Sequence, residues 1–331
     1  MTITTSTGWE AIGHHRQLDG YRVFTVDAPS IGPEHHEPLL ILHGFPTSSF
    51  DYAAVLDGLR AGRRVLLIDG LGYGLSAKPD QPYTLALQAD LAAAFVAELG
   101  LTTLALLTHD VGDTVGGELL ARRQEGTWPV EVARRVITNG SIYIEQAHLT
   151  NGQQLLLGLP DAKLSPDIPI DAASLTRSLR ETFSPTVHLP EAGTREDPLP
   201  ATVEQILRDD GHTMLPRLIR YIEERRQNQA RFTGAIERDP SPLHIVWGMD
   251  DPIAVPAMVD TLVAARPDAS VVRLDGVGHY PMVEAPGRFL EAVQDVSHMV
   301  FFHAVGLKDD EGLMHTEVPT YRSPARCEAP F

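Results

Sequence analysis

The sequence has very little cysteine: Cys327 is the only one among its 331 residues. A single cysteine excludes a disulfide within the chain and fits a reducing compartment, so we expect a cytoplasmic protein. The chain also lacks a run of about 18 apolar residues, which argues against a transmembrane helix. Its first residues have no basic region followed by an apolar one, and we therefore expect no signal peptide.

Basic residues are scarce as well. Lysine and arginine number 27 against 44 aspartates and glutamates, which gives a formal net charge of −17. This excess of negative charge disfavours binding to nucleic acid or to anionic membranes, because both repel an acidic surface. We therefore expect neither a nucleic acid nor a membrane as partner.

Short apolar runs are abundant. Most are near-continuous Val, Ile and Leu, as in parallel strands that are covered on both faces. The predicted strands are residues 21–28, 38–44, 63–70, 103–110, 134–141, 242–249 and 269–276. Helical patterns, such as residues 84–100 and 289–302, lie between them. This alternation predicts an α/β fold with an open, mostly parallel sheet.

The alternation stops in the middle of the chain. Residues 142–236 contain no convincing strand; they are rich in Pro and Leu at first and strongly helical later. We predict a helical cap over 142–236, inserted into a core made of residues 1–141 and 237–304. Residues 305–331 have no apolar period, and we expect them to form an extended tail.

A possible nucleophile lies at the end of one predicted strand. The stretch Thr108-His109-Asp110-Val111-Gly112 has the form small–x–nucleophile–x–Gly. This pattern builds a sharp strand-to-helix turn that lifts the central side chain out of the sheet and points the next N–H at the reacting atom. The usual central residue is serine, whereas this chain has aspartate. The alternative interpretation is that the aspartate only caps the following helix.

Two further strand ends carry an acid and a histidine, Asp251 and His279. Each alone is weak evidence, since Asp-Pro is common in turns and a lone histidine is most often structural. The chain order, however, is nucleophile, acid, histidine, which is the order of the α/β-hydrolase triad. We therefore predict a triad of Asp110, Asp251 and His279, with Asp250 as the competing acid.

Over residues 20–303 the sequence resembles the α/β-hydrolase superfamily. The motifs that carry the resemblance are HGFPTSS (43–49), DGLGYGLSAKP (69–79), THDVGD (108–113), and WGMDDPIAVP (247–256) with GHYPMVEAP (278–286). With aspartate at the nucleophile position, the third motif resembles that of the epoxide hydrolase and haloalkane dehalogenase branch. The stretches HGFPTSSFDY, THDVGDTVGGELL and RYIEERRQNQARF are most similar to the mesoderm-specific-transcript group. The resemblance implies an α/β-hydrolase fold, a mostly parallel central sheet flanked by helices, with an inserted helical cap.

The resemblance also implies a chemistry. A carboxylate nucleophile suits attack on an sp³ carbon that bears a leaving group, which gives an alkyl ester on Asp110. His279 then activates a water that attacks the carboxyl carbon of this ester, while Asp251 orients His279 and stabilises its protonated form. The backbone N–H groups of Phe45 and Val111 hold the oxyanion. The scheme needs no cofactor and no metal.

Two leaving groups fit this scheme. An epoxide leaves as an alkoxide and needs a proton donor, which epoxide hydrolases supply from cap tyrosines; Tyr221 resembles one of these. The second is missing, since residues 144–220 contain no tyrosine, and Tyr143 and His212 are the substitutes. A halide needs only weak N–H donors, and dehalogenases usually have Trp where this chain has Val111.

We therefore expect an epoxide hydrolase-like enzyme that acts on a small apolar substrate, with a haloalkane or haloacid dehalogenase as the alternative. A non-catalytic ligand-binding protein of the same fold is a third hypothesis, which the complete triad disfavours. The histidine pairs 14–15 and 35–36 fall in polar stretches expected to be loops, and we predict no metal site there. His109 is expected to pack under the strand-to-helix turn.

Overall fold

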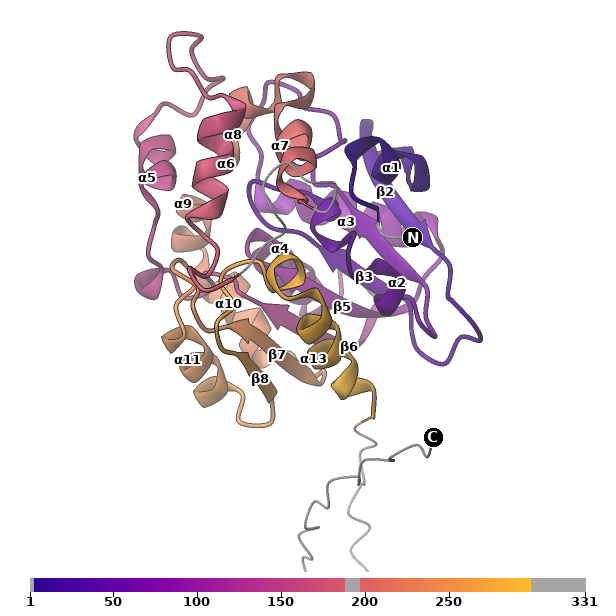
Figure 1. Ribbon diagram of the computed structural model, residues 1–331. Coiled ribbons are helices and arrows are strands. Elements are labelled where there is room, and N and C mark those ends of the chain that lie inside the picture. The colour runs from indigo at the N-terminus through magenta and orange to yellow at the C-terminus, as the bar shows by residue number, and fades with distance from the viewer. Residues whose placement is uncertain (1–2, 188–196, 299–331) are drawn as a thin grey trace, which may run out of the picture. The chain divides into compact units, whose positions relative to one another are not determined.

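The computed structural model describes residues 3–187 and 197–298, and an eight-stranded sheet lies at its centre (Figure 1). The strand order is β1-β2-β4-β3-β5-β6-β7-β8. β2 pairs antiparallel with β1 and β4, and the other pairings are parallel. The strands are β1 His14–Leu18, β2 Tyr21–Ala28, β3 Leu39–Leu42, β4 Val65–Ile68, β5 Thr103–His109, β6 Glu131–Thr138, β7 Leu243–Gly248 and β8 Ser270–Leu274. The predicted α/β class is confirmed.

The continuous apolar runs form the middle of the sheet. β3 and β4, with sequences LLIL and VLLI, are buried at every residue, as expected where helices cover both faces. β5 lies between β3 and β6. The carboxyl end of β5 is therefore central, and the turn that follows it is surrounded by the ends of neighbouring parallel strands.

β1 is a strand that the sequence does not predict. Its residues, HHRQL, are mostly polar and partly exposed, which an edge strand allows because one side of it has no partner strand. His14 and His15, expected in a loop, begin this strand instead. The prediction was wrong because a polar edge strand lacks the apolar run used to find the others.

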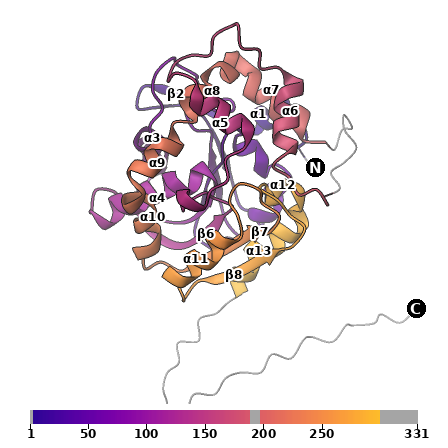
Figure 2. The same ribbon diagram turned by 90° about the vertical axis from the view of Figure 1, so that its left-hand side faces the viewer.

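Helices pack on both faces of the sheet (Figures 1 and 2). On one face α4 (Val111–Gln124) contacts both α3 (Leu85–Glu98) and α10 (Gln229–Arg238). On the other face α13 (Pro286–His298) lies beside α2 (Leu56–Leu59), where Gln294 donates a hydrogen bond to the carbonyl of Gly58. Outside the segment between β6 and β7, the remaining helices are α1 Ser6–Ile12, η1 Ser49–Tyr52, α11 Ala257–Ala265 and α12 Pro281–Glu284. Among the described residues, each helix is too short or too polar to span a bilayer.

Between β6 and β7 the described residues form helices and no strand. These helices are η2 Ile144–Gln146, α5 Asn151–Gly158, α6 Ala172–Arg180, α7 Leu199–Leu207, η3 Arg208–Met214, α8 Leu215–Leu218, α9 Tyr221–Gln227 and α10. Figure 1 shows α5 to α8 gathered together at the top of the view. α10 instead runs along α4. The predicted tail, residues 305–331, lies outside the described residues.

Candidate active site

Asp110 occupies a sharp turn between β5 and α4 and is almost fully buried. Its backbone has φ 49° and ψ −111°, a conformation that L residues rarely adopt and that often marks functional sites. The turn is also tight, because a Cβ at Gly112 would lie 2.3 Å from the carbonyl oxygen of Leu42. The Asp110 side chain makes no hydrogen bond to the start of α4. A simple helix cap therefore does not explain this aspartate.

The two carboxylate oxygens of Asp110 have different surroundings. Oδ2 accepts a hydrogen bond from the backbone N–H of Phe45 at 2.9 Å. Oδ1 is buried and has no hydrogen-bond partner among the described residues. Val111 is the first residue of α4, so that its N–H belongs to the helix end that favours negative charge. Asp110, Phe45 and Val111 thus meet at one point.

His279 and Asp251 form a buried pair at the neighbouring strand ends. His279 Nδ1 lies 2.8 Å from Asp251 Oδ2. The other oxygen, Oδ1, accepts the backbone N–H groups of Ile253 at 2.7 Å and Ala254 at 3.0 Å. Because a carboxylate only accepts, Nδ1 is the donor, and Nε2 is left to take a proton.

Asp250, the competing acid, has another partner. Its Oδ2 accepts a hydrogen bond from the hydroxyl of Ser184 at 2.6 Å. Ser184 follows α6 in the segment between β6 and β7, which we call the helical segment. Of the two adjacent aspartates, Asp251 is therefore the one that is bonded to His279.

Asn139 is a site residue that the sequence analysis missed. It follows β6 with φ 45° and donates from Nδ2 to Asp251 Oδ2 at 2.8 Å. Its Oδ1 accepts the N–H of Gly248 at 2.9 Å, which fixes the end of β7 beside it. The available signal was Asn-Gly at a predicted strand end, since asparagine tolerates the left-handed conformation better than most residues do.

The charges around His279 control its protonation. Burial alone lowers the pKa of His279, but the charge and hydrogen bond of Asp251, together with the charge of Asp110, outweigh this effect and raise the pKa to about 9. His279 is therefore an imidazolium at neutral pH when Asp110 is ionised. Conversion of Asp110 into a neutral ester would remove one of the charges that raise this pKa.

His109 lies directly behind the turn. Its ring is 5.0 Å from that of His279, and its Nδ1 lies 3.1 Å from the carbonyl oxygen of Thr138. Burial and the charge of His279 lower the pKa of His109 to about 3, so it stays neutral. A Cβ at Gly44 would lie 2.8 Å from the His109 ring. The glycine of the HGFPTSS motif therefore leaves room for this ring.

Tyr221, the first residue of α9, is buried against the site. Its ring lies 5.7 Å from that of Phe45. Burial, followed by the charge of Asp110, raises the pKa of its phenol, and the charge of Arg225 opposes this rise only in part. Tyr221 therefore keeps its proton at neutral pH and can act as a donor.

The two substitute donors lie elsewhere. The hydroxyl of Tyr143 donates to Glu237 Oε1 at 2.8 Å, which uses its proton. His212 belongs to η3. Like Asp110 and Tyr221, it is not among the residues that line the cavity beside His279, but Tyr221 packs against the lining residue Phe45. Neither residue supplies the second cap tyrosine of the epoxide hydrolase pattern.

A cavity of about 200 Å³ opens next to His279 and Phe45. The helical segment contributes its apolar wall, which includes Leu156, Leu175 and Leu179. The lining contains no Lys, Arg, Asp or Glu side chain, and its polar groups are hydroxyls, the Gln153 amide and His279 itself. Such a lining suits an uncharged, mainly apolar ligand.

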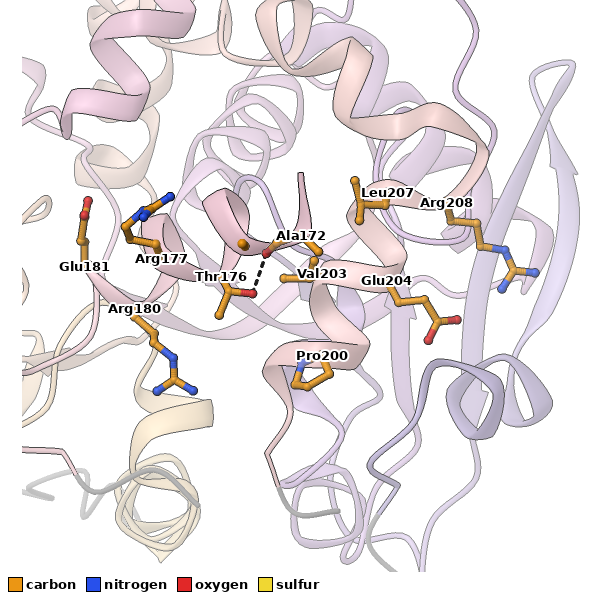
Figure 3. Close-up of a pocket in the computed structure, with 11 residues that line it drawn as sticks. Ala172, Thr176, Arg177, Arg180, Glu181, Pro200, Val203, Glu204, Leu207 and Arg208 are labelled. Atoms are coloured by element: carbon orange, nitrogen blue, oxygen red, sulfur yellow. Dashed lines mark hydrogen bonds between the residues drawn. The ribbon is translucent and has the colours of Figure 1, made fainter. Parts of the chain in front are cut away.

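A larger hollow of about 1240 Å³ lies between α6 and α7 (Figure 3). It has charged residues at its edges, including Arg177, Glu204 and Arg208, and apolar residues such as Leu207 between them. It contains none of the predicted site residues. The smaller cavity is therefore the candidate active site.

The described residues offer no group of three or more His, Cys, Asp or Glu side chains that could hold a metal ion. His15, from one of the histidine pairs, instead has its Nε2 3.1 Å from the carbonyl oxygen of Leu75.

Comparison with known proteins decides the family, because a model of the alpha/beta hydrolase family matches residues 39–292. The chain belongs to the alpha/beta hydrolase family. The putative hydrolase LipZ of Mycobacterium tuberculosis is 38% identical to this alpha/beta hydrolase over 296 residues, which cover 88% of this chain and 98% of LipZ. The human mesoderm-specific transcript homolog protein is 31% identical over 293 residues, 86% of this chain and 85% of that protein.

Among solved structures, haloalkane dehalogenase DbeA from Bradyrhizobium elkani USDA94 has a similar fold, with a TM-score of 0.66. The two chains are 20% identical, and the match covers 86% of this chain and 96% of DbeA. At this identity the likeness concerns the fold alone. The predicted superfamily and the similarity to mesoderm-specific-transcript proteins are confirmed.

Proposed function

We propose that this alpha/beta hydrolase opens a small apolar epoxide to a diol through an alkyl ester on Asp110. The observation that carries the proposal is the difference between the two oxygens of Asp110. Oδ2 is held by the Phe45 N–H, while Oδ1 is buried without a hydrogen-bond partner among the described residues. A carboxylate oxygen that has lost water and gained no donor keeps its lone pairs for a carbon electrophile.

The first step forms the ester. Asp110 Oδ1 attacks a ring carbon, the carbon–oxygen bond of the epoxide breaks, and the leaving oxygen takes the proton of the Tyr221 hydroxyl. Asp110 is then neutral, so the pKa of His279 falls. The proton that His279 carried in the free protein returns to Tyr221 through solvent, and this leaves His279 neutral and able to act as a base.

The second step releases the product. His279 Nε2 takes a proton from water, and the resulting hydroxide attacks the carboxyl carbon of Asp110. The N–H groups of Phe45 and Val111 stabilise the oxyanion, and Asp251 stabilises the imidazolium. Collapse of this intermediate breaks the ester bond, and the departing diol oxygen takes the proton from His279. The new carboxyl group of Asp110 then gives its proton to His279, which restores the carboxylate and the imidazolium of the free protein.

Tyr221 is the reason to favour an epoxide over a halide. A buried, protonated phenol beside Asp110 suits an alkoxide leaving group, which must be protonated. Halide displacement by the same triad is the second candidate, but the side chains of Phe45 and Val111 carry no N–H for a halide. The uncharged cavity lining disfavours a haloacid.

The test of the covalent step is the variant His279→Gln. It should accumulate the ester, and intact-mass measurement should show an increase equal to the whole epoxide, since opening an epoxide loses no atoms. An alkyl halide would instead add its mass less one hydrogen halide. The variant Asp110→Asn with His279→Gln should gain no mass. The absence of any adduct in His279→Gln, while the parent protein turns the same compound over, would overturn the mechanism.

The leaving group is tested with paired epoxides and alkyl halides of the same carbon skeleton. Tyr221→Phe should slow ester formation from the epoxide about 100-fold, the usual size of a general-acid effect, and leave halide displacement nearly unchanged. The opposite result would favour a dehalogenase. A protein that turns over no compound and forms no adduct would be a ligand-binding member of the family.

A further inference from the structure

Arg225 on α9 is fully buried, with 0% of its surface exposed. Its guanidinium donates to the hydroxyl of Thr114 at 2.7 Å and to the main-chain oxygens of Ser141 at 2.9 Å and Asp110 at 3.2 Å. One side chain of the helical segment therefore binds α4, the segment after β6, and the residue that carries the nucleophilic carboxylate.

All three acceptors are neutral oxygens, although a buried charge is costly unless an opposite charge offsets it. Asp113, the nearby carboxyl on α4, does not provide that charge, because burial raises its pKa well above the usual range. The triad of Asp110, Asp251 and His279 carries one net negative charge when His279 is protonated. The guanidinium of Arg225 offsets this charge.

Arg225 also lies over the ring of Tyr221, with the guanidinium carbon 5.0 Å from the ring centroid. A cation over an aromatic face is attracted to the ring, and the attraction is stronger when both are removed from water. The Phe45 ring also packs against Tyr221, at 5.7 Å between ring centroids. Tyr221 thus contacts both the cation of its own helix and the loop that binds Asp110 Oδ2.

We propose that Arg225 is a positioning residue, which fixes Tyr221 against the Asp110 turn and makes its phenol the better proton donor. As the phenol gives up its proton, negative charge develops on an oxygen close to a fixed, desolvated cation. The titratable groups that act on Tyr221 are Asp110, Tyr73 and Arg225, and of these Arg225 is the one that stabilises the phenolate. This inference rests on the proposed role of Tyr221 in epoxide opening.

The experiment compares Arg225→Met, which keeps bulk and removes charge, with Arg225→Lys, which keeps charge and loses the fork of donors. Arg226→Met is the matched control, because Arg226 is the next residue of the helix and is exposed. Arg225→Met should lower kcat for an epoxide at least about tenfold, as expected for a desolvated cation–π contact, with little change in KM. Arg225→Lys should fall between, and the control should not change.

A second pair of variants shows whether Arg225 acts through Tyr221. If it does, Arg225→Met should have little further effect on epoxide opening in a Tyr221→Phe background, because the two changes remove the same interaction. An equal loss in both backgrounds, or an equal loss for epoxide and halide, would overturn the proposal.

A measurement without turnover separates this proposal from the proposed function. With 3-fluorotyrosine placed at position 221, fluorine NMR reports the pKa of that phenol directly. Arg225→Met should raise this pKa, and Arg226→Met should not. An unchanged pKa in folded Arg225→Met and Arg225→Lys, or the failure of both variants to fold, would assign Arg225 to stability alone. Failure of the ester experiment with a shifted fluorine titration would reject the epoxide reaction and keep the Arg225–Tyr221 coupling.

Discussion

His279 sits between two carboxylates, of which only one changes its charge during the proposed reaction. In the free protein the pKa of His279 is about 9, so the group starts as an imidazolium. Once Asp110 is esterified, Asp251 is the remaining partner. The pKa of His279 therefore falls only after the first step. His279 then loses its proton and becomes the neutral base that can take a proton from water.

This predicts a pH dependence for the second step. The rate of ester hydrolysis should increase with pH and level off with an apparent pKa below about 9, because only neutral His279 can accept a proton. The measurement is single-turnover hydrolysis of preformed ester from about pH 6 to 10. A profile that does not depend on pH, or a midpoint above that of the free protein, would contradict this prediction.

Asp51 predicts a pH dependence of stability. Burial raises its pKa to about 8, and its Oδ2 accepts a hydrogen bond from Thr47 at 2.5 Å. From about pH 4 to 8 the folded chain keeps this proton and the unfolded chain has lost it. Unfolding therefore releases a proton, and the free energy of unfolding should fall as pH rises through this range.

Urea unfolding of the parent protein and of Asp51→Asn checks this effect. The variant cannot lose the proton, so its stability should depend less on pH, and the two curves should diverge as pH rises towards 8. Parallel curves would show that Asp51 does not titrate as described.

At the scale of elements, the sequence predicts best the strands whose residues are mostly buried. The strand that ends at His109 and its neighbours are apolar runs with few alternatives, and their order along the chain already implies a parallel sheet. β1 was missed because its polar residues suit an edge. Asn139 and Arg225 were missed because each acts through partners more than 80 residues away in sequence or in another element, and no local pattern encodes such contacts.

α10 shows where a boundary depends on packing. Its sequence is as helical as that of α9, and we placed residues 229–236 with the cap. In the structure α10 lies along α4, and a Cβ at Gly117 would come within 2.7 Å of the carbonyl oxygen of Phe232. The close approach of two helix backbones requires this glycine, which single-sequence periodicity does not reveal.

Gly117→Ala should therefore destabilise the protein by about 1 to 3 kcal/mol, the usual cost of overpacking, although alanine favours a helix more than glycine does. Gly287→Ala is the matched control, because Gly287 lies in α13 and a Cβ there meets nothing within 4 Å. Denaturant unfolding of both variants measures the difference. Equal effects would show that α4 and α10 can move apart without cost.

At the scale of the whole molecule, one carboxylate joins the helical segment to the loop between β8 and α12, which carries His279. Glu284 accepts the backbone N–H groups of Ser184 at 2.8 Å, Gly278 at 2.9 Å and Tyr280 at 2.9 Å. The N–H of His279 also donates to the carbonyl of Thr182 at 3.0 Å. The wall of the cavity and the proposed base are thus parts of one hydrogen-bonded unit.

Glu284→Gln should disturb this unit. The amide keeps one acceptor oxygen and places a donor where N–H groups converge, so we expect a loss of about 1 to 3 kcal/mol in the free energy of unfolding and slower ester hydrolysis. Glu291→Gln, at an exposed position of α13, is the control. Denaturant unfolding and single-turnover kinetics provide the two measurements, and normal hydrolysis in a destabilised variant would limit Glu284 to a structural role.

The bond between the Phe45 N–H and Asp110 Oδ2 has a consequence for how members of this fold exchange chemistries. With Asp110→Ser, that N–H would be free to bind the carbonyl oxygen of a substrate, while His279 and Asp251 would already stand where a serine nucleophile needs them. One substitution would then turn an alkyl-transfer site into a slow acyl-transfer site, detectable as new ester cleavage. The divergence between these two kinds of hydrolase would need very few evolutionary steps.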